Sequence, residues 1–340
     1  MLGFILRRCV TMAWTMLVVS VLVFVIVNLP PGDILTNQIN QLMASGESSS
    51  VARARFLAEQ YSLDEPLWKQ YLIWIGFWPG PDGLSGILQG DYGWSFELDR
   101  PVSEIVAEAM WMTVVLNLTT IVFVYVFALP LGAIAAVKAN SWIDYTATFI
   151  GYIGLATPNF LLAIVLYHKG AEWFGLPVGG MMSREFAGQP MSVDKLLDIA
   201  AHLVVPVIVI GTSGMAAMVR RLRANLLDEL GKPYVVTAAA KGMGPTRAVV
   251  KYPLRMALNP FVADIGNMLP QLVSGSVLVS VVMGLQTIGP ILLSSLKSQD
   301  YFLSGFILLF VSALTLVGML VSDILLALLD PRIRYVARAR

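Results

Sequence analysis

The sequence of 340 residues contains few of the side chains that enzymes and metal proteins use. Cys9 is the only cysteine, which excludes an intrachain disulfide and a cysteine-rich metal site. The two histidines, His168 and His202, are isolated, so we expect no His-based metal site. No Gly-x-x-x-x-Gly-Lys-Ser/Thr loop is present, and we therefore predict that the chain does not hydrolyse ATP itself. We expect no metal, no cofactor and no nucleic-acid partner.

Charge is also scarce, at 13% of residues, whereas a soluble domain carries about 25%. Six charge-free runs each exceed the roughly 18 apolar residues that mark a membrane-spanning helix. These runs are residues 9–32, 109–137, 145–168, 199–219, 265–296 and 301–322. Because Gly284, Gly289 and Pro290 interrupt the fifth run, we predict one span there, followed by an apolar loop. The fold class is therefore all-α: a polytopic membrane protein with six transmembrane helices.

Lys and Arg side chains set the orientation of such a protein, because they accumulate in short cytoplasmic loops. Most of the 23 basic residues fall on one side of the predicted spans. They are Arg7, Arg8, Lys138, Arg220, Arg221, Arg223, Lys232, Lys241, Arg247, Lys251, Arg255, Arg332, Arg334, Arg338 and Arg340. We therefore predict that both the N-terminus and the C-terminus are cytoplasmic.

The runs divide the chain into residues 1–32 with the first transmembrane helix, a sizeable outer segment 33–108, and a core 109–340 with helices two to six. Within the outer segment, residues 47–59 read as a short polar helix. A second, aromatic helix is predicted over 65–78, lying on the membrane surface or over the mouth of a pore. Its apolar face would contain Leu67, Trp68, Tyr71, Leu72, Ile75 and Trp78.

The loop 220–259 contains eight basic residues against Asp228 and Glu229. Pro233 suits the first turn of a helix, and Gly242 suits a left-handed C-terminal cap. We therefore predict a short exposed helix over 233–242, with a second helix after Pro245 that is kinked at Pro253. Two interpretations fit these residues: a docking surface for another protein, or an ordinary basic loop on the cytoplasmic side.

The segment Tyr-Val-Val-Thr-Ala-Ala-Ala-Lys-Gly at 234–242 resembles the cytoplasmic coupling motif of binding-protein-dependent ABC importer permeases. More specifically, it is similar to the oligopeptide/dipeptide/nickel permease family. Further stretches match the same family in the same order along nearly the whole chain. They are Arg7-Arg8 with Pro31-Gly32-Asp33, and the segments 61–71, 90–96, 101–102 and 330–335.

This resemblance implies a permease subunit, multi-pass in the bacterial inner membrane, that is not an enzyme. It implies a homologous second permease subunit, two cytoplasmic ATPase subunits that hold ATP and Mg²⁺, and an external substrate-binding protein. It also implies contact with the membrane lipid. The residues expected to couple to the ATPases are Tyr234, Thr237, Ala238, Ala239, Lys241, Gly242 and Arg247. Among them, the small side chains of Thr237, Ala238 and Ala239 are expected to let a partner approach closely.

Two stretches depart from the family pattern. The wider superfamily has an acidic residue where this chain has Val236, so we expect the ATPase contact to rely on Lys241 or Arg247 instead. The stretch 79–88 is longer than the pattern and leaves the geometry toward substrate and partners open.

Several polar residues lie inside the predicted spans. For Asp264 and Asp323 we expect a pairing near the inner helix ends, with a basic residue such as Arg255 or Arg332. On the fifth span, Asn267, Gln271 and Ser274 share one helical face, which makes them candidate pore-lining residues or bridges between helices.

The solute is left open by the residues. A peptide-like solute ranks first, and an oligosaccharide, an opine or nickel are alternatives within the same architecture. A stand-alone secondary transporter is a less favoured class, because we find no internal repeat and no ionisable group at mid-membrane depth.

Overall fold

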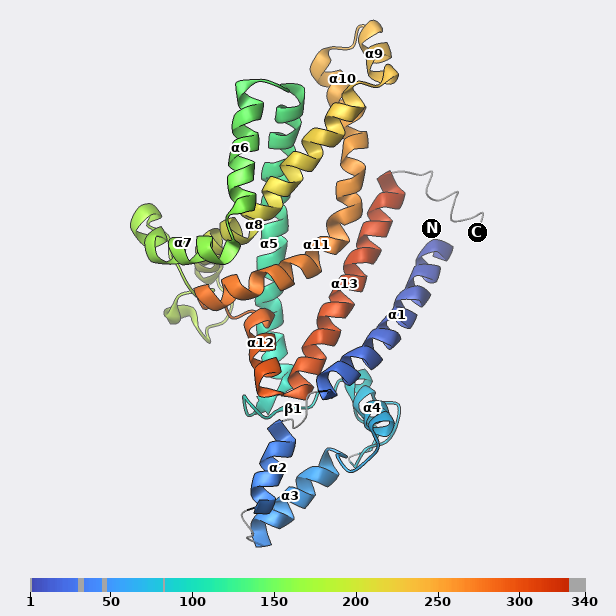
Figure 1. Cartoon of the computed structure of the whole chain (residues 1–340), viewed down its shortest axis with the longest axis vertical. Helices are drawn as coiled ribbons and strands as arrows, with labels where there is room; N and C mark the ends of the chain where they lie inside the picture. Colours follow the sequence, from blue (N-terminus) through green and yellow to red (C-terminus); the bar gives the residue numbers. More distant parts are fainter. Residues whose placement is uncertain (1, 30–33, 45–47, 82, 330–340) are drawn as a thin grey trace. The chain divides into compact units, whose positions relative to one another are not determined.

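The computed structural model describes residues 2–29, 34–44, 48–81 and 83–329. Apart from two short strands, the regular elements of these residues are helical (Figure 1). In chain order the helices are α1 Leu2–Asn28, α2 Ile34–Ala44, α3 Ser48–Gln60, α4 Leu67–Ile75, η1 Ile87–Gln89, α5 Val102–Val137, α6 Trp142–Ala156, α7 Asn159–Phe174, η2 Arg184–Phe186, α8 Val193–Leu230, α9 Pro233–Ala240, α10 Pro245–Lys251, α11 Pro253–Met283, α12 Ile288–Ser298 and α13 Tyr301–Leu329. Strands β1, Trp94–Ser95, and β2, Arg100–Pro101, pair antiparallel.

Four of the described helices, α1, α5, α8 and α13, are each long and apolar enough to cross a membrane by themselves. Two bent pairs, α6 with α7 and the end of α11 with α12, raise the number to six if each pair is one span. The prediction of an all-α, polytopic membrane protein is confirmed. The orientation of the two termini stays a prediction.

The third span, predicted as one helix within the run 145–168, is not continuous. It is broken into α6 and α7, which meet at an angle of 94°. The break falls at Thr157 and Pro158, both in extended conformation. Proline disfavours the helical conformation of the residue before it and lacks the N–H that would continue the ladder, so the helix ends there.

The prediction of an apolar loop after the fifth span is wrong, because residues 288–298 form α12. Gly284 does end α11, in a left-handed conformation with φ of 63°. Gly289 and Pro290, however, lie in the first turn of α12, where the missing N–H of proline costs no hydrogen bond. The bend between the two helices is 92°.

The chain forms two compact units. The first contains residues 1–5, 112–286 and 315–340, and the second contains 6–111 and 287–314. In the first unit, α8 contacts α6, α7 and α11, and α11 also contacts α7. Two apolar cores lie in this unit, one around Leu203 and Met283 and the other around Leu222 and Phe261.

The second unit has its own apolar clusters, around Val102 and Ile307 and around Phe24 and Trp74. Helix α3 matches the polar helix predicted over 47–59. Helix α4 matches the predicted aromatic helix. Trp74 and Ile75 are buried, whereas Leu67 and Trp68 are more than half exposed.

Candidate functional site

The connection between α8 and α11 contains two short helices, α9 and α10, at the tip of the first unit (Figure 1). Each of α9, α10 and α11 begins with a proline, which is preorganised for a first turn. The predicted helix over 233–242 is confirmed as α9. The kink expected at Pro253 is instead a complete break at Tyr252, where φ is −120° and ψ is −75°.

Gly242 ends the turn after α9 in the left-handed conformation that the sequence predicted, with φ of 78°. Its N–H donates to the carbonyl of Ala239 at 2.9 Å, and the N–H of Met243 donates to the carbonyl of Ala238 at 3.2 Å. A Cβ added at Gly242 would meet no atom within 4 Å. The demand for glycine is therefore set by backbone conformation and not by crowding within this chain.

The residues expected to face a partner are exposed with one exception. Ala238 is buried, at 7% exposure, so the expectation that its side chain lies on the exposed small-residue face is wrong. Val235, three residues earlier, is also partly buried. Residues three apart lie on the same face of a helix, so Val235 and Ala238 lie on the face of α9 that packs inward. The exposed members are Tyr234, Thr237, Ala239, Lys241, Gly242 and Arg247.

Helix α9 is attached to the end of α8 through Glu229. This carboxylate accepts hydrogen bonds from the Lys232 ammonium, at 2.5 Å, and from the Tyr234 hydroxyl. Burial, together with the bond to Glu229, raises the pKa of Tyr234 to about 12. The phenol is therefore protonated at neutral pH and remains the donor of this bond.

Two ion pairs connect the helices beneath α9 to one another. Arg221 of α8 binds Asp264 of α11 at 2.8 Å. Asp264 therefore pairs with a basic residue as predicted, but the partner is Arg221 and not Arg255. For Asp323, the suggested partner Arg332 lies outside the described residues.

The second ion pair, between Asp144 of α6 and Arg223 of α8, was missed by sequence reasoning. Arg223 donates to both carboxylate oxygens, from Nε to Oδ1 at 2.5 Å and from Nη2 to Oδ2 at 2.6 Å. The backbone N–H of Asn140 adds a third bond at 2.9 Å. Asp144 is only 1% exposed. The sequence contained one signal for this ion pair: Asp144 is an acidic residue in the first turn of a span, on the side of the membrane where arginines are concentrated.

Two neutral hydrogen bonds extend this framework to the remaining helices of the first unit. The Tyr125 hydroxyl of α5 donates to the Phe261 carbonyl of α11 at 2.8 Å. The Ser322 hydroxyl of α13 donates to the Val262 carbonyl of α11 at 2.9 Å. The α8–α11 connection is thus anchored to helices that are themselves bonded to α5, α6 and α13.

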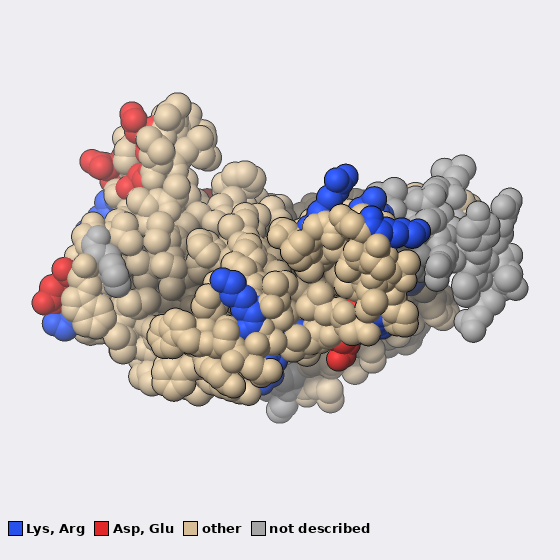
Figure 2. Space-filling model, turned by 90° about the horizontal axis from the view of Figure 1, so that it is seen from above, with Lys and Arg blue, Asp and Glu red and all other residues tan. Residues whose placement is uncertain are grey.

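Figure 2 views the molecule from above, onto the end that contains α9, and shows basic side chains gathered there.

On α11, Gln271 and Ser274 are exposed, whereas the side chain of Asn267 lies outside the described residues. Their role in lining a pore stays a prediction. In the part of the chain that the structure describes, no three His, Cys, Asp or Glu side chains come together as a metal site would need.

Comparison with known proteins decides the family. The model for the binding-protein-dependent transport system inner membrane component matches residues 128–335, and the N-terminal model for membrane components of the same systems matches residues 1–119. The chain belongs to this family. It is a multi-pass inner-membrane permease component of a transport system that depends on a binding protein, as the resemblance implied.

Three relatives of this permease show how far the similarity extends. The oligopeptide transport system permease protein AppB of Bacillus subtilis is 34% identical, over 98% of this chain and 100% of its own length. The dipeptide transport system permease protein DppB of Escherichia coli K12 is 32% identical, over 98% and 99%. The glutathione transport system permease protein GsiC of the same strain is 31% identical, over 98% and 100%.

Proposed function

We propose that this permease moves a peptide-like solute into the cytoplasm, driven by ATP hydrolysis in separate subunits. Relatives that cover almost the whole chain are named for oligopeptides, dipeptides and glutathione, which supports a solute of this class. An external binding protein delivers the solute. A homologous second permease subunit completes the pathway, and two ATPase subunits hold ATP and Mg²⁺.

Helix α9 is the element that we assign to the ATPase contact. The observation that carries this proposal is its attachment: α9 is bonded to α8 through Glu229 and leads through α10 into α11. A displacement of α9 therefore acts on α8 and α11 together. Because Arg221 and Arg223 bond α8 to α11 and α6, these helices would move as one body.

The orientation follows from the same assignment. If α9 meets cytoplasmic ATPases, the basic loop 220–259 is cytoplasmic, and the Lys and Arg distribution places both termini on that side. The segment 33–108 then faces outward, where the binding protein delivers its cargo.

The experiment compares Gly242→Asp with Gly242→Asn in the complete transport system. Both side chains adopt a left-handed backbone at similar cost, but only aspartate adds a negative charge to this basic surface. We expect Gly242→Asp to abolish uptake and Gly242→Asn to reduce it less, with equal amounts of complex in the membrane. Unchanged uptake by Gly242→Asp would refute the assignment of α9.

The partners are tested by purifying the tagged permease from native membranes in mild detergent. We expect a second permease and ATPase subunits to co-purify, with ATP turnover stimulated by one external binding protein. A chain that purifies alone and transports without ATP would contradict the proposal and favour a secondary transporter.

A further inference from the structure

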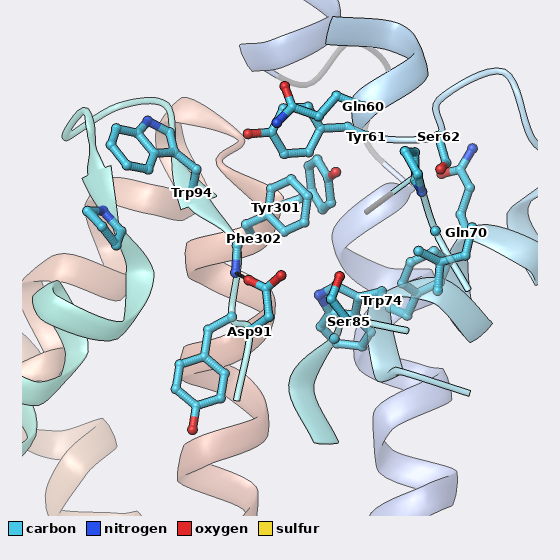
Figure 3. Close-up of a pocket in the computed structure, with 18 residues that line it drawn as sticks. Gln60, Tyr61, Ser62, Gln70, Trp74, Ser85, Asp91, Trp94, Tyr301 and Phe302 are labelled. Carbon is cyan, nitrogen blue, oxygen red and sulfur yellow. Dashed lines mark hydrogen bonds between the residues drawn. The ribbon is translucent and has the colours of Figure 1, made fainter. Parts of the chain in front are cut away.

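The second unit contains a cavity of about 340 Å³, within the size range of small-molecule sites (Figure 3). Its walls come from α1, the end of α3, α4, the loops before and after α4, the region of β1 and β2, and the first turn of α13. The stretch 79–88, which the sequence predicts to be longer than the family pattern, supplies part of the wall through Gly80, Pro81, Ser85 and Gly86. None of these residues belongs to the α9 site.

The shape of this cavity is held by the chain's own bonds. Gly80 and Gly83 exchange backbone hydrogen bonds of 2.8 and 3.1 Å, which close the turn between α4 and η1. The amide of Gln89 donates to the Gly76 carbonyl at 2.9 Å and ties η1 back to the end of α4. The walls are therefore preorganised before any ligand binds.

Aromatic rings form one side of the cavity. The Tyr61 and Phe302 rings lie 5.3 Å apart between centroids, and Tyr301 and Phe302 lie 4.0 Å apart. Figure 3 shows these three rings on one side and Asp91, Trp74 and Ser85 on the other. Ring faces of this kind attract cations.

Charge in the cavity is negative. Among the described residues that line the cavity, Asp91 alone carries a formal charge at neutral pH, and its Oδ1 accepts a bond from the Gly93 N–H at 3.1 Å. A neighbouring cavity is lined by Glu59, Asp64, Glu65 and Lys69. Lys69 is already bonded to Glu65 at 2.5 Å. The surroundings therefore add to the preference for a cation.

Trp74 supplies the second polar group. Its side chain is 92% buried, at 8% exposure, and its indole N–H has no hydrogen-bond partner among the described residues. A buried donor without an acceptor is unfavourable, and Trp74 is one of the residues that line the cavity. A ligand that brings a carbonyl oxygen would satisfy it.

We propose that this cavity binds the N-terminal end of a short peptide. An α-amino acyl group combines the two features that the walls require, an ammonium and a carbonyl a few bonds away. The ammonium binds Asp91 and the aromatic rings, and the first carbonyl accepts from the Trp74 indole. This inference rests on the proposed peptide function and on the outward placement of the segment 33–108, and it gives the permease a recognition site of its own beside the binding protein.

The test uses the full chain in lipid nanodiscs and titration calorimetry with two probes, tri-alanine and N-acetyl-tri-alanine. Acetylation removes the ammonium and retains the rest of the peptide. We expect tri-alanine to bind and the acetylated probe to bind at least about tenfold more weakly. The reason is that loss of a hydrogen bond to a charged group lowers an affinity by about tenfold or more. Equal binding of the two probes, or no binding of tri-alanine, would overturn the proposal.

Two variants assign the binding to this cavity. Asp91→Asn removes the charge but retains an oxygen for the Gly93 N–H, and we expect about a tenfold loss of affinity. Trp74→Phe removes the indole N–H but retains a ring beside Phe24, and we expect a severalfold loss. Asp99→Asn and Trp68→Phe, which change exposed residues outside the cavity, should bind like the unaltered chain. Unchanged affinity in Asp91→Asn would refute the inference.

Uptake of labelled tri-alanine by the complete system separates this inference from the proposed function. Import by the unaltered system, together with equal binding of both probes to the chain, would contradict the cavity assignment alone. Specific binding that Asp91→Asn weakens would support the cavity whether or not that peptide is imported. Failure to import any peptide would contradict the proposed function.

Discussion

Breaking the Asp144–Arg223 ion pair should destabilise the permease by different amounts depending on which partner is removed. Asp144 is 1% exposed, whereas the Arg223 side chain is 29% exposed. In Arg223→Gln a carboxylate stays buried without its counter-ion, and we expect a loss of about 3 kcal/mol in the free energy of unfolding. In Asp144→Asn water can rehydrate the guanidinium, and we expect about 1.5 kcal/mol.

The double variant provides the sharper measurement. Because it leaves neither charge buried, we expect a loss of about 2 kcal/mol, well below the total for the two single variants. The assay is unfolding of the full chain in mixed micelles by titration with a denaturing detergent. Arg220→Gln is the matched control, since Arg220 is exposed and lies 5.9 Å from the Tyr152 ring, and it should cost no more than about 1 kcal/mol.

Additivity would refute this reasoning. If the double variant loses the total for the two single variants to within about 0.5 kcal/mol, the groups do not interact in the folded protein. A larger loss in Asp144→Asn than in Arg223→Gln would contradict the argument from burial.

Two further predictions concern packing and pH. Gly132→Val should destabilise the chain by about 1–3 kcal/mol in the same assay. The reason is that a Cβ at Gly132 would lie 3.0 Å from the Leu222 Cβ and from the Val219 carbonyl oxygen. Gly275→Val is the control: a Cβ there would meet no atom within 4 Å, so this substitution should change stability little. Burial raises the pKa of Asp300, which accepts a bond from the Ser95 hydroxyl at 2.7 Å. Its contribution to stability is therefore fully present below the ordinary carboxyl pKa and is lost as pH rises through the higher folded value. Asp300→Asn should lack this pH-dependent loss of stability. If the stability of Asp300→Asn changed with pH as steeply as that of the unaltered chain, the raised pKa of Asp300 would be contradicted.

Local signals in the sequence were sufficient to predict helix α9 and its two ends. Charge-free runs predicted the membrane spans, because lipid requires apolar side chains over the whole width of a helix. Pro233 and Gly242 predicted the beginning and the end of the α9 turn, because each restricts or permits backbone conformations by itself. The family resemblance rested on this stretch and on further short stretches in the same order along the chain.

Proline was ambiguous as a signal when its position in a helix was unknown. Pro158 breaks the third span into two helices, but Pro290 lies in the first turn of α12, and Pro206 is accommodated inside α8. The same missing N–H has different consequences, because it matters only where a preceding carbonyl would have accepted it.

Tertiary structure alone decided which distant side chains meet. Arg223 and Asp144 are 79 residues apart, and Arg221 and Asp264 are 43 apart, so no local pattern identifies either pair. The inward side of Ala238 and the cavity beside Trp74 likewise depend on what packs against each helix. The sequence by itself determined the class, the spans and the helix that we assign to coupling, since these follow from short-range conformational preference and hydrophobicity. Pairing, burial and cavities depend on how the helices pack, which only the folded chain specifies.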